Sequence, residues 1–109
     1  MRQTTLPEQT AKLIELGFEK PKSIEVYQDG HCVPFVEQQW AYSISELIEM
    51  LKPIKNLRIS VDNSYNCLED LIVKRLVVNK WEILFGAVGN DLIDLLFSAI
   101  VKLKEEGVI

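Results

Sequence analysis

The amino-acid sequence predicts an α+β fold of two layers, in which an antiparallel sheet of three to five strands carries about three helices mainly on one side. Three segments place apolar residues at helical spacing, and strand-like segments follow one another through residues 57–87 without an intervening helix. Consecutive strands with short connections pair in an antiparallel sheet and leave the helices to cover one face. A chain of 109 residues supports one hydrophobic core, so we expect a single domain over residues 1–109.

The first helix is expected over residues 6–16. Thr5 and Glu8 have the spacing of a capping box, in which a hydroxyl accepts an early backbone N–H and a carboxylate reaches back. Pro7 is tolerated in the first turn because its missing N–H would have no partner there. Gly17 predicts the end of the helix, since the left-handed conformation of a C-terminal cap costs glycine little.

A hairpin is predicted next. The extended segment 24–27 is followed by Asp29-Gly30, a dipeptide typical of two-residue hairpin turns. Residues 31–36 would form the returning strand. Pro34 within it favours an edge strand or a loop, because proline donates no hydrogen bond to the ladder.

A second helix is predicted to begin after Ser43 and to end before Pro53. Ser43 and Glu46 form another capping-box pair, and apolar residues from Ile44 to Leu51 recur at helical spacing.

Strands are predicted over residues 57–62, 71–78 and 80–87, the last two joined tightly near Asn79. Alternation places two sets of apolar residues each on one face of its strand: Leu57, Ile59 and Val61 in the first, and Trp81, Ile83 and Phe85 in the third.

The last helix is predicted over residues 91–106, with Asn90 as its N-terminal cap and Gly107 as its C-terminal cap. Its polar residues form one narrow stripe, and the remaining apolar arc is broader than one sheet face normally covers. We therefore expect this helix either to lie between two layers or to meet a partner.

The charge balance disfavours nucleic acid as a partner. The chain has 12 Lys and Arg against 16 Asp and Glu, a net charge of −4, whereas counterion release on a nucleic acid requires a surplus of cations. No apolar run approaches the ~20 residues of a membrane span. Without an export signal, we expect a cytoplasmic protein in which Cys32 and Cys67 are reduced.

No motif assembles a catalytic, metal or cofactor site, so we expect a protein that is not an enzyme and has no cofactor. His31 and Cys32 are adjacent, but neighbouring side chains on a strand point to opposite faces, so the imidazole would not activate the thiol. One histidine and two distant cysteines do not supply the four ligands of a structural zinc site.

Two loops resemble binding motifs in part. Residues 62–73 begin like a calcium loop, but Cys67 stands where glycine is required and Val73 where a bidentate glutamate belongs. Residues 86–90 precede a helix as phosphate loops do, but no lysine follows and Asp91 would repel a phosphate. The first is predicted to be a polar turn, and nucleotide binding at the second is excluded.

The remaining charged groups have structural explanations. Glu46 with Glu49, and Asp91 with Asp94, are ordinary acidic residues of first helical turns. Cationic residues at Lys52, Lys55, Arg58, Lys74 and Arg75 predict a solvated sheet face or a balance for the acidic surface.

Exposed aromatic and apolar residues supply the candidate partner-binding set. Trp40 and Tyr42 lie just before a helix, where the alternating pattern does not require an aromatic residue, and such residues can anchor a partner. The structural explanation, a staple against Leu47 or packing at a sheet edge, is the one the pattern favours. Phe97 and Ile100, on the broad apolar arc of the last helix, complete the set.

Three stretches resemble a group of small proteins encoded in Bacteroidetes genomes, often among phage or other mobile-element genes. They are AKLIELGFEKPKS at 11–23, WAYSISELIEML at 40–51, and the segment from DLIDLLF to KLKEEG at 91–107. Ser45 stands where glycine is expected in such relatives. The resemblance implies a bacterial, cytoplasmic setting and brings no activity, ligand or catalytic residue.

We therefore expect a non-enzymatic accessory or regulatory protein of a bacterial or mobile-element system. It would bind another protein, or a second copy in a symmetric dimer, through an apolar or aromatic surface. One alternative is an acidic inhibitor or nucleic-acid mimic of a host protein, and another is a small-molecule-binding protein or small enzyme. Binding by an acidic mimic would weaken strongly with salt, whereas apolar binding would not.

Overall fold

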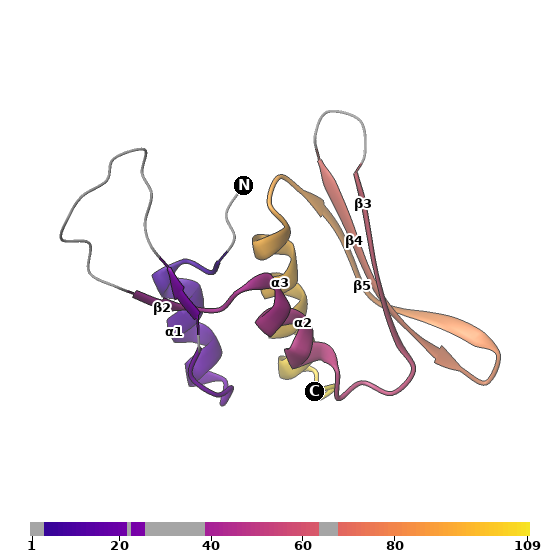
Figure 1. The fold of residues 1–109 in the computed structure, drawn as a ribbon. Helices are drawn as coiled ribbons and strands as arrows, with labels where there is room; N and C mark the ends of the chain where they lie inside the picture. The colour runs from indigo at the N-terminus through magenta and orange to yellow at the C-terminus, as the bar shows by residue number, and fades with distance from the viewer. Residues whose placement is uncertain (1–3, 22, 26–38, 64–67) are drawn as a thin grey trace.

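The computed structural model describes residues 4–21, 23–25, 39–63 and 68–109. Figure 1 shows the helices and strands that these residues form. In chain order they are α1 (Pro7–Glu15), β1 (Ser23–Glu25), β2 (Gln39–Ala41), α2 (Ile44–Leu51), β3 (Leu57–Asn63), β4 (Glu69–Val77), β5 (Lys80–Gly89) and α3 (Leu92–Glu105).

The strands form two antiparallel sheets. β3, β4 and β5 pair in the order β3-β4-β5, and β1 pairs with β2 in a separate two-stranded sheet. The α+β class and the consecutive antiparallel strands predicted between residues 57 and 87 are therefore confirmed.

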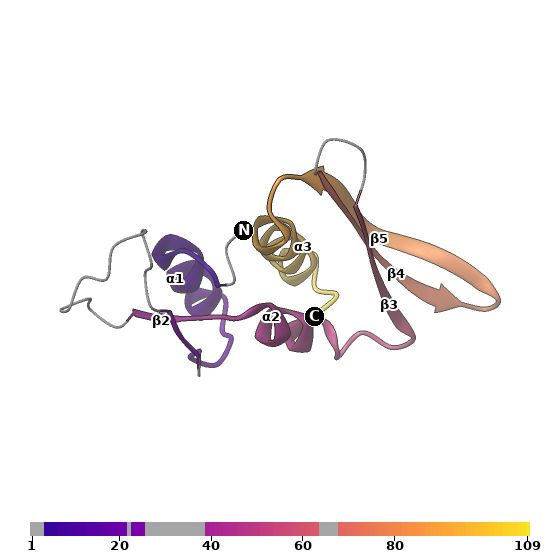
Figure 2. The same ribbon diagram turned by 45° about the horizontal axis from the view of Figure 1, so that its top comes forward.

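All three helices lie on one side of the β3-β4-β5 sheet, as Figures 1 and 2 show. α2 and α3 lie between the sheet and α1 in both views. α3 contacts β4, β5 and α2, and Gln9 of α1 donates a hydrogen bond of 2.8 Å to Asp94 of α3. The broad apolar arc of α3 is thus explained by its place between layers, the first of the two arrangements expected for it.

Buried side chains from α1, α2, β4 and α3, and from the segments on either side of α2, form one hydrophobic core. Its members are Leu13, Tyr42, Leu47, Leu51, Ile54, Leu71, Val73, Ile93, Leu95, Leu96, Ala99, Ile100 and Leu103. Each fully buried leucine or isoleucine stabilises the fold by roughly 1.5–3 kcal/mol relative to an exposed one.

The extent of the first helix is confirmed, but its cap differs from the prediction by one residue. α1 has Leu6 at its N-cap, and the Leu6 N–H donates to Oε1 of Gln9 at 2.9 Å. The predicted pair of Thr5 and Glu8 is therefore wrong. Thr5 is fully buried, and its hydroxyl accepts a hydrogen bond from the N–H of Tyr42 instead. Gly17 does adopt a positive φ, +102°, just after the helix.

The partner of the first short strand also differs from the prediction. A turn at Asp29-Gly30 would place Phe35 opposite Ile24, but Trp40 lies opposite Ile24 in the structure. The predicted pairing of residues 24–27 with residues 31–36 is therefore wrong for β1. The predicted turn and returning strand lie in residues 26–38, outside the described residues.

Caps define the other two helices. The predicted box at α2 is confirmed, because the Glu46 N–H donates to Ser43 Oγ and the Ser43 N–H donates to Glu46 Oε1, at 3.3 and 3.2 Å. For α3, the N-cap is Asp91, whose Oδ1 accepts from the N–H of Ile93 at 3.0 Å. The prediction that Asn90 caps this helix was wrong by one residue.

A β-bulge divides β5. The β4–β5 register shifts so that Phe85 lies opposite Val73 and Ile83 lies opposite Lys74, which leaves Leu84 as an extra residue. An extra residue reverses the alternation beyond it. Phe85 therefore packs against the core, while Trp81 and Ile83 lie on the opposite face, and the predicted common face for these three residues is wrong.

Candidate interaction surface

One face of the β3-β4-β5 sheet is turned away from the helices. In β4, the side chains of Glu69, Leu71 and Val73 are buried. Successive side chains of a strand point to opposite faces, so Ile72 and Lys74 lie on the other side. In Figures 1 and 2, no helix of the described residues lies against that side. We call it the outer face.

Large apolar side chains gather on the outer face. Arg58 and Ile83 both lie opposite Lys74, and Trp81 lies opposite Leu76. The exposed fractions of the apolar side chains are high: Leu76 37%, Trp81 48%, Ile83 66% and Val88 56%. A group of exposed apolar side chains on one surface of a small protein is typical of an interaction site.

Two cations lie over the indole ring of Trp81. The distance to the ring centroid is 5.5 Å from Arg58 Cζ and 4.9 Å from Lys74 Nζ, within the range of cation–π attraction. Among the described residues, neither cation is paired with a carboxylate. This half of the outer face is therefore cationic and aromatic, although the chain has a net charge of −4.

The other half of the outer face is acidic. Asp62 of β3 lies directly opposite Asp70 of β4. A row of small or neutral residues separates the two halves, and it consists of Ser60, Ile72 and Gly86, which are paired across the strands. Like charges directly opposite each other destabilise a sheet, so the fold by itself gives no reason for the aspartate pair.

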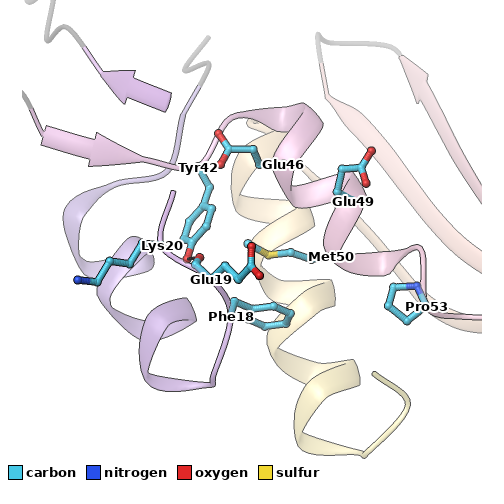
Figure 3. A pocket seen from close by; sticks show the side chains of 8 residues that line it. All are labelled: Phe18, Glu19, Lys20, Tyr42, Glu46, Glu49, Met50 and Pro53. Atoms are coloured by element: carbon cyan, nitrogen blue, oxygen red, sulfur yellow. Dashed lines mark hydrogen bonds between the residues drawn. The ribbon is translucent and has the colours of Figure 1, made fainter. Parts of the chain in front are cut away.

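A groove lies on the helical side, between α2 and the segment that follows α1 (Figure 3). Its volume is about 620 Å³. It is lined by Phe18, Glu19, Lys20, Tyr42, Glu46, Glu49, Met50 and Pro53.

Contacts within the chain engage many of the groups that line the groove. The Tyr42 hydroxyl donates to the backbone carbonyl of Glu19, and Glu46 is held in the cap of α2. The Lys104 ammonium lies 5.4 Å from the centroid of the Phe18 ring. Burial raises the pKa of Tyr42 above its ordinary value, and the carboxylates of Glu46 and Glu19 raise this pKa further. These contacts serve the fold, and the groove is the weaker candidate site.

The residues predicted to bind a partner do not form a common surface. Tyr42 is 2% exposed and Ile100 is fully buried, so both belong to the core, and this corrects the expectation that they are surface residues. Phe97 is partly buried against the same core. Trp40 lies in β2 opposite Ile24, and its side chain is outside the part of the chain that the structure describes.

The sequence predicted a solvated sheet face, or a balance for the acidic surface, at cations that include Arg58 and Lys74. It did not identify an interaction surface there, because alternation alone does not say which face of a strand is covered. Trp81 and Ile83 alternate with Lys80 and Glu82, which is a clear two-faced pattern. The signal that could have found the site is the combination of this apolar pair with the cations Arg58 and Lys74 on neighbouring strands, since cations are unsuited to a covered face.

Metal and membrane functions gain no support from the described residues. Within the described ranges, no group of three or more His, Cys, Asp or Glu residues could hold a metal ion. Among the helices described, none is long and apolar enough to cross a membrane. His31, Cys32 and Cys67 lie outside the described residues, and residues 86–89, considered as a phosphate loop, belong to β5.

Comparisons with protein-family models, with curated proteins and with solved structures each give no match for this chain. The resemblance to proteins of Bacteroidetes genomes therefore stays a prediction.

Proposed function

We propose that this chain is a small interaction protein, an accessory factor that acts by binding protein through the outer face of its β3-β4-β5 sheet. The observation that carries the proposal is the exposure of Leu76, Trp81, Ile83 and Val88 on a face that none of the described helices covers. Tryptophan is the residue most often found at the energetic centre of protein interfaces. A bacterial, cytoplasmic setting, near mobile-element genes, belongs to the same proposal and rests on the resemblance alone.

The two alternative functions have weaker support. An acidic mimic would present its carboxylates to a basic site, whereas the apolar part of the outer face carries the cations Arg58 and Lys74. The groove has a volume suited to a small molecule, but hydrogen bonds and ion pairs within the chain already engage Tyr42, Glu46 and Glu49.

The test compares two glutamate substitutions on the same hairpin. Ile83→Glu places a carboxylate on the outer face, and Val77→Glu is the matched control, because Val77 is 43% exposed on the opposite face of β4. We expect a tagged wild-type chain and Val77→Glu to retain the same stoichiometric protein, whether another protein or the untagged chain, from a lysate of bacteria that also express the untagged chain. Ile83→Glu should lose it, because the carboxylate replaces an apolar contact, and burying it at an interface costs free energy that its neighbour Lys74 does not fully recover.

The capture is repeated at low and at high salt, and thermal melting confirms that each variant folds. Retention at high salt supports an apolar contact. Equal capture by wild type and Ile83→Glu would contradict the proposal. Capture of a basic protein by the wild type and by Ile83→Glu alike, with loss at high salt, would instead favour the acidic mimic.

A further inference from the structure

We propose that the protein bound by the outer face is a second copy of this chain, in a two-fold symmetric dimer whose sheets pack face to face with their strands antiparallel. The inference rests on the proposed function, because it uses the same face. It goes further by naming the occupant, the symmetry axis and the residue pairs that meet.

The outer face is divided so that it complements itself. Its cationic half carries Arg58 and Lys74, its acidic half carries Asp62 and Asp70, and no described residue neutralises either pair through an ion pair. The central row of Ser60, Ile72 and Gly86 lies between the halves. When a second copy faces this surface with its strands reversed, the cationic half of each copy meets the acidic half of the other.

The register fixes which residues would meet. The two-fold axis lies between the two facing sheets, perpendicular to the strands and along the central row. It places each residue opposite the residue of the second copy that lies at the same distance on the other side of that row. Residues 58 and 62 flank Ser60, and residues 70 and 74 flank Ile72, in each case two residues away. The axis therefore brings Arg58 to Asp62 of the second copy and Lys74 to Asp70 of the second copy, with each contact made twice.

The same two-fold rotation also brings apolar residues of the two copies together. Ile83 lies at the level of Lys74, and Val88 lies at the level of Asp70, both on β5. The axis brings Ile83 to Val88 of the second copy and Ile72 to its own equivalent. A Cβ added to Gly86 would meet nothing within 4 Å, so the central row leaves room for facing sheets to approach to about 10 Å.

The charges exclude the other face-to-face symmetry. A two-fold axis along the strands keeps each residue at its own level, so it would bring Lys74 to Lys74 and Asp70 to Asp70. Like charges placed together at an interface repel each other and oppose association. The antiparallel arrangement converts these repulsions into attractions, and it also supplies the cations that the Asp62–Asp70 pair lacks within one chain.

The experiment is a charge-swap rescue, measured as the dimer dissociation constant by analytical ultracentrifugation of the full chain. Protein concentrations from about 10 μM to about 500 μM cover the range of a weak dimer. The variants are Lys74→Asp, Asp70→Lys and the double variant that carries both. Lys80→Asp is the matched control, because it changes the net charge as Lys74→Asp does but lies opposite Val77, off the outer face.

We expect the wild type and Lys80→Asp to dimerise equally. Each single reversal should raise the dissociation constant about tenfold or more, because it creates two like-charge contacts. The double variant should restore it to within about threefold of wild type, because opposite charges again meet across the axis. Far-UV circular dichroism and melting temperature verify the fold of each variant.

Three results would overturn the inference: a wild-type chain that stays monomeric throughout, single reversals that dimerise as wild type does, or a double variant that stays dissociated. These outcomes are separable from failure of the proposed function. A monomeric chain that still captures another protein, and loses it on Ile83→Glu, would keep the docking face and reject the second copy.

Discussion

Two threonine hydroxyls tie the start of α1 to the end of β2. The Tyr42 N–H donates to Thr5 Oγ1 at 3.0 Å, and the Thr10 hydroxyl donates to the carbonyl of Leu6 at 3.1 Å. The two hydroxyl oxygens are 2.6 Å apart. Each hydroxyl has one proton, so Thr5 donates to Thr10, and the chain of hydrogen bonds is complete. It holds the backbone of Tyr42 at the point from which its ring enters the core.

The raised pKa of Tyr42 predicts a loss of stability at alkaline pH. An unfolded tyrosine ionises near pH 10, whereas the folded Tyr42 keeps its proton to higher pH, so unfolding releases a proton between these values. The free energy of unfolding should therefore fall as pH rises above about 10, and Tyr42→Phe should make this fall shallower. At neutral pH the variant should lose about 0.5–1.5 kcal/mol with its hydrogen bond to Glu19. Urea unfolding from pH 7 to about pH 11 measures both effects, and identical slopes would contradict the assignment.

Tyr42 and Trp81 show how far the neighbouring sequence predicts whether an aromatic side chain is buried or exposed. Both are aromatic residues beside polar ones, and the sequence left Tyr42 open as a surface anchor beside the favoured explanation of a structural staple. Its burial depends on partners at Thr5 and Glu19, which lie 37 and 23 residues away along the chain. Local pattern carries no information about such partners.

The β4–β5 hairpin closes through a strained two-residue turn. Val78 and Asn79 have φ of +46° and +64°, the left-handed pair of a type I′ turn, which favours Asn or Gly and disfavours β-branched residues. Val78 is 88% exposed, so it gains little from burial there. Val78→Asn should therefore raise the free energy of unfolding by about 1 kcal/mol. A chemical denaturation midpoint that is unchanged or lower would show that the turn is not strained.

The helices were predicted well, because their ends depend on residues that are close by in the sequence. The bounds of all three helices follow from local caps and from spacing. The cap at Asn90 was wrong by one residue because the adjacent Asp91 competes for it, and the cap at Thr5 was wrong because the Thr5 hydroxyl accepts from the N–H of Tyr42 instead. The β-bulge at Leu84 was missed, since it depends on the pairing of β5 with β4. Without the bulge, simple alternation assigns Phe85 and Trp81 to the same face of β5, so the outer face was not recognised.

A single core joins the helices to the sheet, so the described elements should unfold together. Leu96→Ala, in the core at 1% exposure, should cost about 2–5 kcal/mol. Trp81→Ala, on the outer face, should cost about 1 kcal/mol or less. Unfolding followed by far-UV circular dichroism and by near-UV circular dichroism should give coincident transitions. Two separated transitions would contradict a single domain over residues 1–109.

In the part of the molecule that the structure describes, the helices are engaged by the core and the outer face of the sheet is left uncovered (Figures 1 and 2). Site-specific photo-crosslinking tests this most directly, with a benzophenone amino acid placed at position 83 or at position 77 of the chain in living bacteria. The account predicts a discrete crosslinked adduct from position 83 and little or none from position 77, and mass spectrometry of the adduct identifies the bound chain. Adducts of equal yield from both positions, or from position 77 alone, would contradict the assignment of the outer face as the docking surface.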